Sequence, residues 1–170
     1  QPVPADDVAA VERLDRMRGH SEDVFLENCR GDDFFGVQTY SRTRVAADGN
    51  LGAEPGVPSL VMGYEFYPQA LGATIRRAWE VTGHVPIVVT ENGIGTDDDL
   101  QRIDYVSQAL EGVLGCLADG IDVRGYTYWS ALDNFEWAFG YEPRFGLVGV
   151  HRATQRRIPK PSAEWLGRIA

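Results

Sequence analysis

Apolar positions recur along the chain in two periods, and these periods predict the order of its helices and strands. Two aspartates, Asp6 and Asp7, can cap a helix near the N-terminal end. The apolar residues after them recur at helical spacing: Val8, Val11, Leu14 and Met17. The aromatic and β-branched stretch 34–40 predicts a strand. Residues 46–63, which include six glycines and prolines, predict a long loop.

The second half of the chain alternates strand and helix patterns. Pro68 suits the first turn of a helix whose inward residues are Leu71, Ile75, Ala78 and Trp79. The near-continuous apolar run 86–90 predicts a strand buried on both faces. The next helix begins near residues 97–99, ends at Gly120 and is expected to point these residues inward: Leu100, Ile103, Val106, Leu110, Val113, Leu114 and Leu117. A strand over 123–129 and a short helix from Pro161 complete the pattern.

Helices that lie between successive strands predict parallel strands with right-handed crossovers. We therefore expect an α/β fold in a single domain that covers residues 1–170, with no internal repeat and no linker. The chain is short for a complete barrel of eight such units, which takes about 250 residues.

Composition narrows the classes of partner. With 170 residues and 44% hydrophobic content, the chain can bury one core. Its formal net charge of −9 argues against nucleic acid or an anionic membrane as partner.

No apolar segment approaches the roughly 20 residues of a membrane span. The first residues have neither an initiator Met nor a signal-peptide pattern, so we expect a cut or processed end. Cys29 and Cys116 are expected to be buried, reduced thiols in a cytoplasmic protein.

Glu91 is the first candidate for chemistry, because it follows the buried strand 86–90 and precedes Asn92 and Gly93. A buried carboxylate without donors is costly, so Glu91 is either solvated or held by donors. The C-terminal ends of parallel strands commonly carry ligands and catalytic groups. A carboxylate there can attack or stabilise an anomeric carbon. The alternative is an ordinary solvated loop glutamate.

The segment from Trp129 to Trp137 is the second candidate. It interleaves Asp133, Asn134 and Glu136 with aromatic residues, which suits neither a core strand nor an amphipathic helix. A glutamate can accept hydrogen bonds from two sugar hydroxyls, and an indole offers an N–H and an apolar face. This pattern favours carbohydrate binding, whereas the alternative is ordinary core packing.

The sequence predicts no metal and no cofactor. His20, His84 and His151 share no metal-ligand spacing. The run 93–95 resembles the start of a dinucleotide-binding motif, but Asp98 occupies the place of its third glycine.

Together these residues resemble the retaining β-glycosidases of glycoside hydrolase family 1. The run Thr90–Gly93 looks like the family's nucleophile signature, and further matches extend along the chain over Arg102–Tyr105, Trp129–Trp137, Gly140–Tyr141, Arg144–Gly146 and Thr154–Ala163. The resemblance implies that Glu91 is the nucleophile. Its matched runs supply the candidate substrate-binding residues, which are Asn92, Trp129, Glu136, Trp137 and Phe145.

Upstream, the stretch 33–40 looks like the strand whose tyrosine hydrogen-bonds the nucleophile, which makes Tyr40 a second candidate catalytic residue. The family usually has Asn-Tyr-Tyr there, so Gln38 and Thr39 depart from its pattern. His151 is another departure, at a position where the family often has Asp.

The resemblance covers about strands six to eight, with their helices, of a (β/α)8 TIM barrel. The acid/base signature of the family, Asn-Glu-Pro, does not occur in the sequence. The resemblance therefore implies the C-terminal part of a β-glucosidase-like enzyme that acts on non-phosphorylated β-glycosides or oligosaccharides. Its partner would be a complementary N-terminal barrel segment or a second copy of the chain. Two alternatives stay open: a catalytically silent carbohydrate-binding or structural half-barrel, and a barrel of unrelated function.

Overall fold

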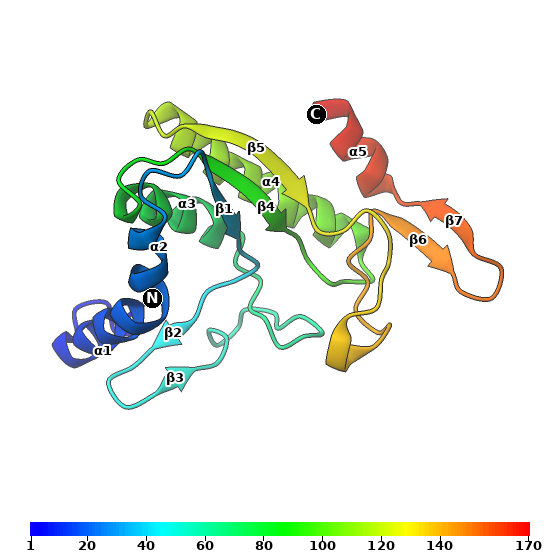
Figure 1. Cartoon of the computed structure of the whole chain (residues 1–170). Helices are drawn as coiled ribbons and strands as arrows, with labels where there is room; N and C mark the ends of the chain where they lie inside the picture. Colours follow the sequence, from blue (N-terminus) through cyan, green and yellow to red (C-terminus); the bar gives the residue numbers. More distant parts are fainter.

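A three-stranded parallel sheet forms the centre of the computed structural model, which describes all of residues 1–170 (Figure 1). The strand order is β1 (Phe35–Gln38), β4 (Ile87–Asn92) and β5 (Val123–Tyr128). The crossovers contain α3 (Ala70–Val81) and α4 (Asp99–Ala118), which pack against each other and against one face of the sheet. The predicted parallel α/β arrangement is confirmed.

Helix starts coincide with the capping residues that the sequence contains. Helix α1 (Val8–Arg18) begins after Asp7, whose carboxylate accepts hydrogen bonds from the backbone N–H groups of residues 9 and 10. The carboxylate of Asp98 caps α4 in the same way. These side chains satisfy N–H groups that have no partner within the helix. A π-helical turn over residues 19–23 joins α1 to the short helix α2 (Val24–Asn28).

The core lies between the sheet and the two crossover helices. Its residues are apolar or carry a single polar tip, and include Val37, Leu71, Ile75, Ile87, Val89, Ile94, Tyr105, Val106, Ala109, Val113 and Cys116. The predicted inward face of α4 is partly wrong, because Leu100 is 74% exposed and Leu114 is 64% exposed. Arg102 and Tyr105 are buried in this helix instead. This burial is possible because Arg102 donates a hydrogen bond to the carbonyl of Thr96 and Tyr105 donates one to the carbonyl of Tyr40.

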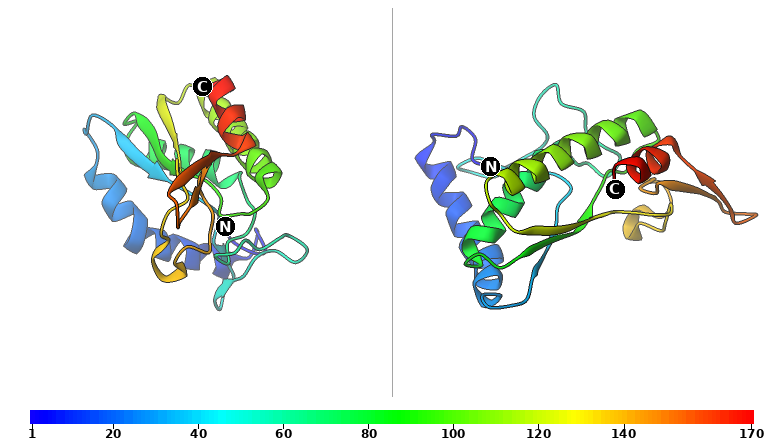
Figure 2. Two further views of the ribbon diagram at one scale, coloured as in Figure 1. Left: turned by 90° about the vertical axis from the view of Figure 1, so that its right-hand side faces the viewer. Right: turned by 90° about the horizontal axis from the view of Figure 1, so that it is seen from above.

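Two antiparallel hairpins lie outside the parallel sheet. The first, β2 (Arg44–Val45) with β3 (Asn50–Leu51), lies partly within the predicted loop. The second pairs β6 (Val148–His151) with β7 (Arg156–Pro159) and was not predicted. The last helix, α5 (Pro161–Ile169), begins at its predicted proline. Figure 2 shows this hairpin and α5 at one end of the molecule, and α1 and α2 at the other.

The three parallel strands end at the same edge of the sheet. Their C-terminal ends lead into the loops 39–43, 93–98 and 129–136, so these loops lie near one another. Within the chain, β1 and β5 each pair only with β4 and form the two sides of the sheet. No helix combines the length and the apolar composition needed to cross a membrane. Both cysteines are free thiols, Cys116 buried and Cys29 half-buried.

Candidate active site

Glu91 lies at the C-terminal end of β4, and its carboxylate oxygens accept hydrogen bonds from the end of β1 and from the loop that follows β1. The hydroxyl of Tyr40 donates to Oε2 at 2.6 Å, and the side-chain amide of Gln38 donates to Oε1 at 3.0 Å. A shift of register after Val37 places Gln38 opposite Glu91. The half-buried carboxylate therefore has two fixed donors, which hold its orientation.

Tyr40 is held as a protonated donor. Burial raises the pKa of its phenol far above the ordinary value, and the hydrogen bond to Glu91 with the charges of Glu91 and Glu136 raises it further. The ring of Phe145 packs edge-on against Tyr40, with ring centres 5.9 Å apart.

Asn92 is fully buried and has its polar atoms bonded within the chain. Its Nδ2 donates to the carbonyl of Thr39 at 2.7 Å and to the hydroxyl of Tyr105 at 3.2 Å. Its Oδ1 accepts a hydrogen bond from Tyr126 at 2.9 Å. Tyr105 in turn donates to the carbonyl of Tyr40 at 2.7 Å. Asn92 thus holds the backbone that carries Tyr40 and does not offer a free group to a ligand.

Glu136 and Trp129 form a second polar pair at this edge of the sheet. The indole N–H of Trp129 and the amide of Asn134 both donate to Oε1 of Glu136, at 3.0 and 2.6 Å. Oε2 accepts no hydrogen bond from the chain, although Glu136 is only 6% exposed. This oxygen is therefore available to a ligand. Trp137 begins the short 3₁₀ helix η2 (Trp137–Phe139), is 83% exposed, and its indole makes no hydrogen bond within the chain.

The two loops that carry Glu91 and Trp129 approach closely where they leave the sheet. The backbone N–H of Trp129 donates to the carbonyl of Asn92 at 2.9 Å. A β-carbon at Gly93 would overlap the carbonyl oxygen of Trp129. Only a glycine permits this approach, which brings the ends of β4 and β5 together.

The C-terminal edge of the sheet thus carries two carboxylates, those of Glu91 and Glu136, each fixed by hydrogen-bond donors, and the half-buried indole of Trp129. Such a set can stabilise a developing positive charge or form a covalent ester, and can bind hydroxyl groups. No group of three or more His, Cys, Asp or Glu side chains is placed to hold a metal ion.

Sequence reasoning assigned no individual role to Gln38, Tyr105 or Asn134. Gln38 is two residues before Tyr40 along an extended chain, so both side chains can point to the same face. This spacing was the signal that could have identified it as a second donor.

Comparison with known proteins gives the family. The profile described as "Glycosyl hydrolase family 1" matches residues 29–170. The chain belongs to glycosyl hydrolase family 1. The resemblance inferred from the motifs is therefore confirmed.

Family 1 relatives match this chain along part of their own length. A bifunctional β-D-glucosidase/β-D-fucosidase of Bifidobacterium breve is 44% identical over 125 residues, which are 66% of this chain and 27% of the relative. A 1,4-β-D-glucan glucohydrolase of Thermotoga neapolitana is 37% identical over 151 residues, 81% of this chain and 34% of the relative. A 6-phospho-β-galactosidase of Streptococcus mutans is 37% identical over 144 residues, 79% of this chain and 31% of the relative.

Solved structures of family 1 show the same fold. The β-glycosidase BGL167 superposes with a TM-score of 0.90 at 53% identity, over 99% of this chain and 39% of that one. A β-glycosidase from Pyrococcus horikoshii gives a TM-score of 0.86 at 30% identity, over 97% of this chain and 44% of that one. The chain thus spans 39% and 44% of these two proteins. Its parallel sheet corresponds to part of their (β/α)8 barrel, as predicted.

Proposed function

We propose that this chain supplies the nucleophile and part of the sugar-binding site of a retaining β-glycosidase that acts on non-phosphorylated β-glycosides. The observation that carries the proposal is the carboxylate of Glu91, which is fixed by Tyr40 and Gln38 at a strand end of a family 1 fold. The general acid would lie on barrel strands outside residues 1–170, because the sequence has no Asn-Glu-Pro motif.

In the proposed mechanism, Glu91 attacks the anomeric carbon and forms a glycosyl ester. An acid about 5–5.5 Å away protonates the leaving oxygen, and water then hydrolyses the ester. Tyr40 stays protonated throughout, because burial and the nearby carboxylates raise its pKa far above neutrality. Its hydroxyl can therefore stabilise the carboxylate before attack and again when the ester breaks.

The sugar itself would be bound by the segment at the end of β5. The free Oε2 of Glu136 can accept hydrogen bonds from sugar hydroxyls. Trp129 presents a half-buried indole, and Trp137 presents an exposed indole. We assign Asn92 and Phe145 a supporting role under Tyr40 in place of direct sugar contact, because both are buried.

The charge of Glu136 favours sugars without a phosphate, since a carboxylate repels a phosphate dianion. Family membership alone does not decide this point, because relatives include enzymes named for both kinds of substrate. The expected result is a higher kcat/KM for an aryl β-glucoside than for its 6-phosphate. A preference for the phosphorylated sugar would overturn the assignment of Glu136.

The second candidate function is a carbohydrate-binding or structural half-barrel without turnover. The absence of the Asn-Glu-Pro motif favours it, because the chain alone lacks the acid that the mechanism needs. A preparation that binds β-glucosides but never forms a covalent glycosyl adduct would support this alternative.

Covalent trapping tests the proposal most directly. Residues 1–170, combined with the N-terminal barrel strands of a family 1 relative, are treated with a 2-fluoro glycoside that carries an activated leaving group. Mass spectrometry should place the label on the peptide that contains Glu91. Glu91→Gln should abolish labelling and lower hydrolysis by several powers of ten.

The matched control is Glu164→Gln, because Glu164 is an exposed glutamate on α5 and its side chain is 70% accessible. This variant should label like the parent. Label on another residue, together with an active Glu91→Gln variant, contradicts the assignment of the nucleophile.

A further inference from the structure

Three consecutive backbone carbonyl groups in the segment 144–146 each accept a hydrogen bond from a different buried or half-buried side chain. These bonds join Arg102 Nη2 to the carbonyl of Arg144 at 2.7 Å, the Tyr128 hydroxyl to that of Phe145 at 2.8 Å, and Lys160 Nζ to that of Gly146 at 2.7 Å. Two of these carbonyl groups also accept a backbone N–H, that of Thr96 for Arg144 at 3.2 Å and that of Ser130 for Phe145 at 3.4 Å. The three side chains therefore add to backbone bonds that already hold this segment.

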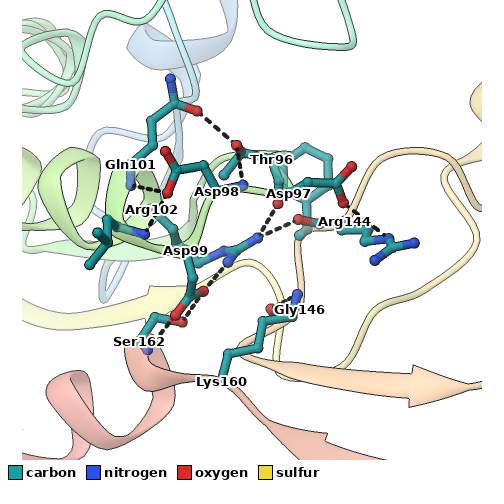
Figure 3. Close-up of polar contacts among 12 residues, drawn as sticks. Thr96, Asp97, Asp98, Asp99, Gln101, Arg102, Arg144, Gly146, Lys160 and Ser162 are labelled. Atoms are coloured by element: carbon teal, nitrogen blue, oxygen red, sulfur yellow. Dashed lines mark hydrogen bonds and ion pairs between the residues drawn. The ribbon is translucent and has the colours of Figure 1, made fainter.

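The three donors come from different parts of the fold, and two of them, Arg102 and Lys160, are fixed by further side-chain bonds. Arg102, on α4, forms an ion pair with Asp99 and donates to the carbonyl of Thr96 at 2.6 Å (Figure 3). Asp99 also accepts hydrogen bonds from the backbone N–H and the hydroxyl of Ser162, at 2.7 and 2.8 Å. This places the start of α5 against the start of α4.

Lys160, just before α5, is the only lysine in the sequence. It donates to Asp133 at 2.9 Å as well as to the carbonyl of Gly146. Asp133 also accepts the backbone N–H of Gly146 at 2.9 Å. The ammonium group of Lys160 and the carboxylate of Asp133 therefore bind the carbonyl and the N–H of Gly146, and each charge has the other as its partner.

Tyr128 keeps its proton at neutral pH. Burial raises the pKa of Tyr128 to about 12, although the charge of Arg102 opposes this shift. Burial lowers the pKa of Lys160, and its hydrogen bond to Asp133 opposes that shift. If segment 144–146 moved, the hydroxyl of Tyr128 and the charged groups of Arg102 and Lys160 would each lose a hydrogen-bond acceptor. Movement of the segment is therefore costly.

The held segment carries Phe145, which is 2% exposed. Its ring contacts the ring of Tyr40, and the hydroxyl of Tyr40 donates to Glu91. Gly95 leaves the space for this ring, since a β-carbon there would lie 2.9 Å from a Phe145 ring atom. A continuous path of contacts thus runs from the three donors to the carboxylate.

We propose that Arg102, Tyr128 and Lys160 form a carbonyl clamp that positions Phe145 and, through it, Tyr40 against Glu91. All three are positioning residues, because none of them contacts Glu91. The inference rests on the proposed role of Glu91 for its effect on rate, whereas the clamp itself can be tested without catalysis.

The test uses Tyr128→Phe, which removes one hydroxyl and keeps the ring. The matched control is Tyr141→Phe, because Tyr141 is 48% exposed and its hydroxyl makes no hydrogen bond. Both variants are made in residues 1–170 combined with the N-terminal barrel strands of a family 1 relative. Two quantities are measured at pH 7: amide hydrogen exchange in the peptide that contains residues 144–147, and the rate constant of covalent trapping by an activated 2-fluoro glycoside.

Tyr128→Phe should speed exchange in this peptide about tenfold or more and slow trapping about tenfold, whereas the control changes neither. Phe145→Leu keeps the three donors but removes the ring contact, so it should slow trapping without speeding exchange. The double variant should trap no more slowly than the slower single variant, because both act through the same contact.

Unchanged exchange in Tyr128→Phe would overturn the clamp. Faster exchange with unchanged trapping would overturn its positioning role and leave a purely structural one. If the parent protein is not labelled at all, the proposed function fails, and the exchange measurement still decides whether the clamp holds segment 144–146.

Discussion

At the scale of single residues, the two oxygens of Glu91 have unequal donors. Tyr40 donates from a phenol at 2.6 Å, and Gln38 donates from an amide at 3.0 Å. Each bond stabilises the negative charge, which makes the carboxylate a weaker attacking group and a better leaving group. Gln38, which departs from the usual family asparagine, is therefore expected to affect the second chemical step more than the first.

We expect Gln38→Leu to slow hydrolysis of the glycosyl ester about tenfold, because a hydrogen bond to a charged group contributes about 1.5–3 kcal/mol and this one is solvent-exposed. The measurement is the reactivation rate of the trapped 2-fluoro glycosyl-enzyme. Gln108→Leu, on α4, is the control, because the side chain of Gln108 hydrogen-bonds Gln69 and Asp104 and not Glu91, and it should reactivate at the parent rate. Equal rates for both variants would remove Gln38 from the site.

At the scale of elements, the contact between the ends of β4 and β5 depends on Gly93. In Gly93→Ala, the new methyl group would overlap the carbonyl of Trp129, whose backbone is held by its own bond to Asn92. We expect the free energy of unfolding to fall by about 3 kcal/mol or more. Chemical denaturation measures this change.

Gly167→Ala is the matched control for this prediction. Gly167 lies in α5, and a β-carbon there would meet no atom within 4 Å. Alanine at this position should stabilise the protein by up to about 1 kcal/mol, because it favours the helix. If Gly93→Ala were equally well tolerated, the close approach of the two strand ends would be wrong.

The junction of α4 and α5 predicts a dependence of stability on pH. Burial tends to raise the pKa of Asp99, but the hydrogen bonds from Ser162 and the charge of Arg102 outweigh it, and the pKa is lower than usual. A carboxyl group with a lowered pKa stabilises the fold above its unfolded value of about 3.9. This contribution is lost as the pH falls from there through the lower folded value.

Asp99→Asn should therefore lower the free energy of unfolding most at neutral pH. The difference in unfolding free energy between parent and variant should shrink below about pH 4. Urea titrations at pH 6 and pH 3 measure it, with Asp48→Asn on an exposed turn as the control. A difference that stays constant with pH would show that the charge of Asp99 contributes nothing.

At the scale of the whole molecule, the sheet is open on both sides. Strands β1 and β5 each pair on one side only, and α3 and α4 cover one face. Unpaired strand edges promote association with other strands, and three strands cannot close a barrel. We propose that complementary barrel strands, from an N-terminal segment or from a second copy, complete the sheet.

Residues 1–170 alone are accordingly expected to be loosely folded or oligomeric, and inactive. Adding an N-terminal family 1 segment should give a defined species with a cooperative thermal transition and β-glucosidase activity. Light scattering, a thermal melt and an aryl β-glucoside assay measure these properties. A monodisperse monomer that melts cooperatively and hydrolyses the glucoside unaided would contradict the proposal.

Local signals in the sequence predicted most of the secondary structure. Asp7, Asp98 and Pro161 mark helix starts, because capping depends only on residues within one turn. The apolar run before Glu91 marks β4 for the same local reason. The β6–β7 hairpin was missed, since its strands have four residues each and none of their residues is fully buried, so their pattern carries little hydrophobic signal.

By itself, the sequence determined the family, the parallel direction of the strands and the placement of Glu91 at a strand end, because motifs and periodicity are properties of neighbouring residues. The resemblance also implied the contact of Tyr40 with that carboxylate, whereas only the tertiary structure decided which other group contacts it. The register shift after Val37 places Gln38 against Glu91, and packing buries Asn92 and Phe145 beneath Tyr40. These contacts join residues some 50 or more positions apart, and they depend on how the strands align and how the loops fill the space between them.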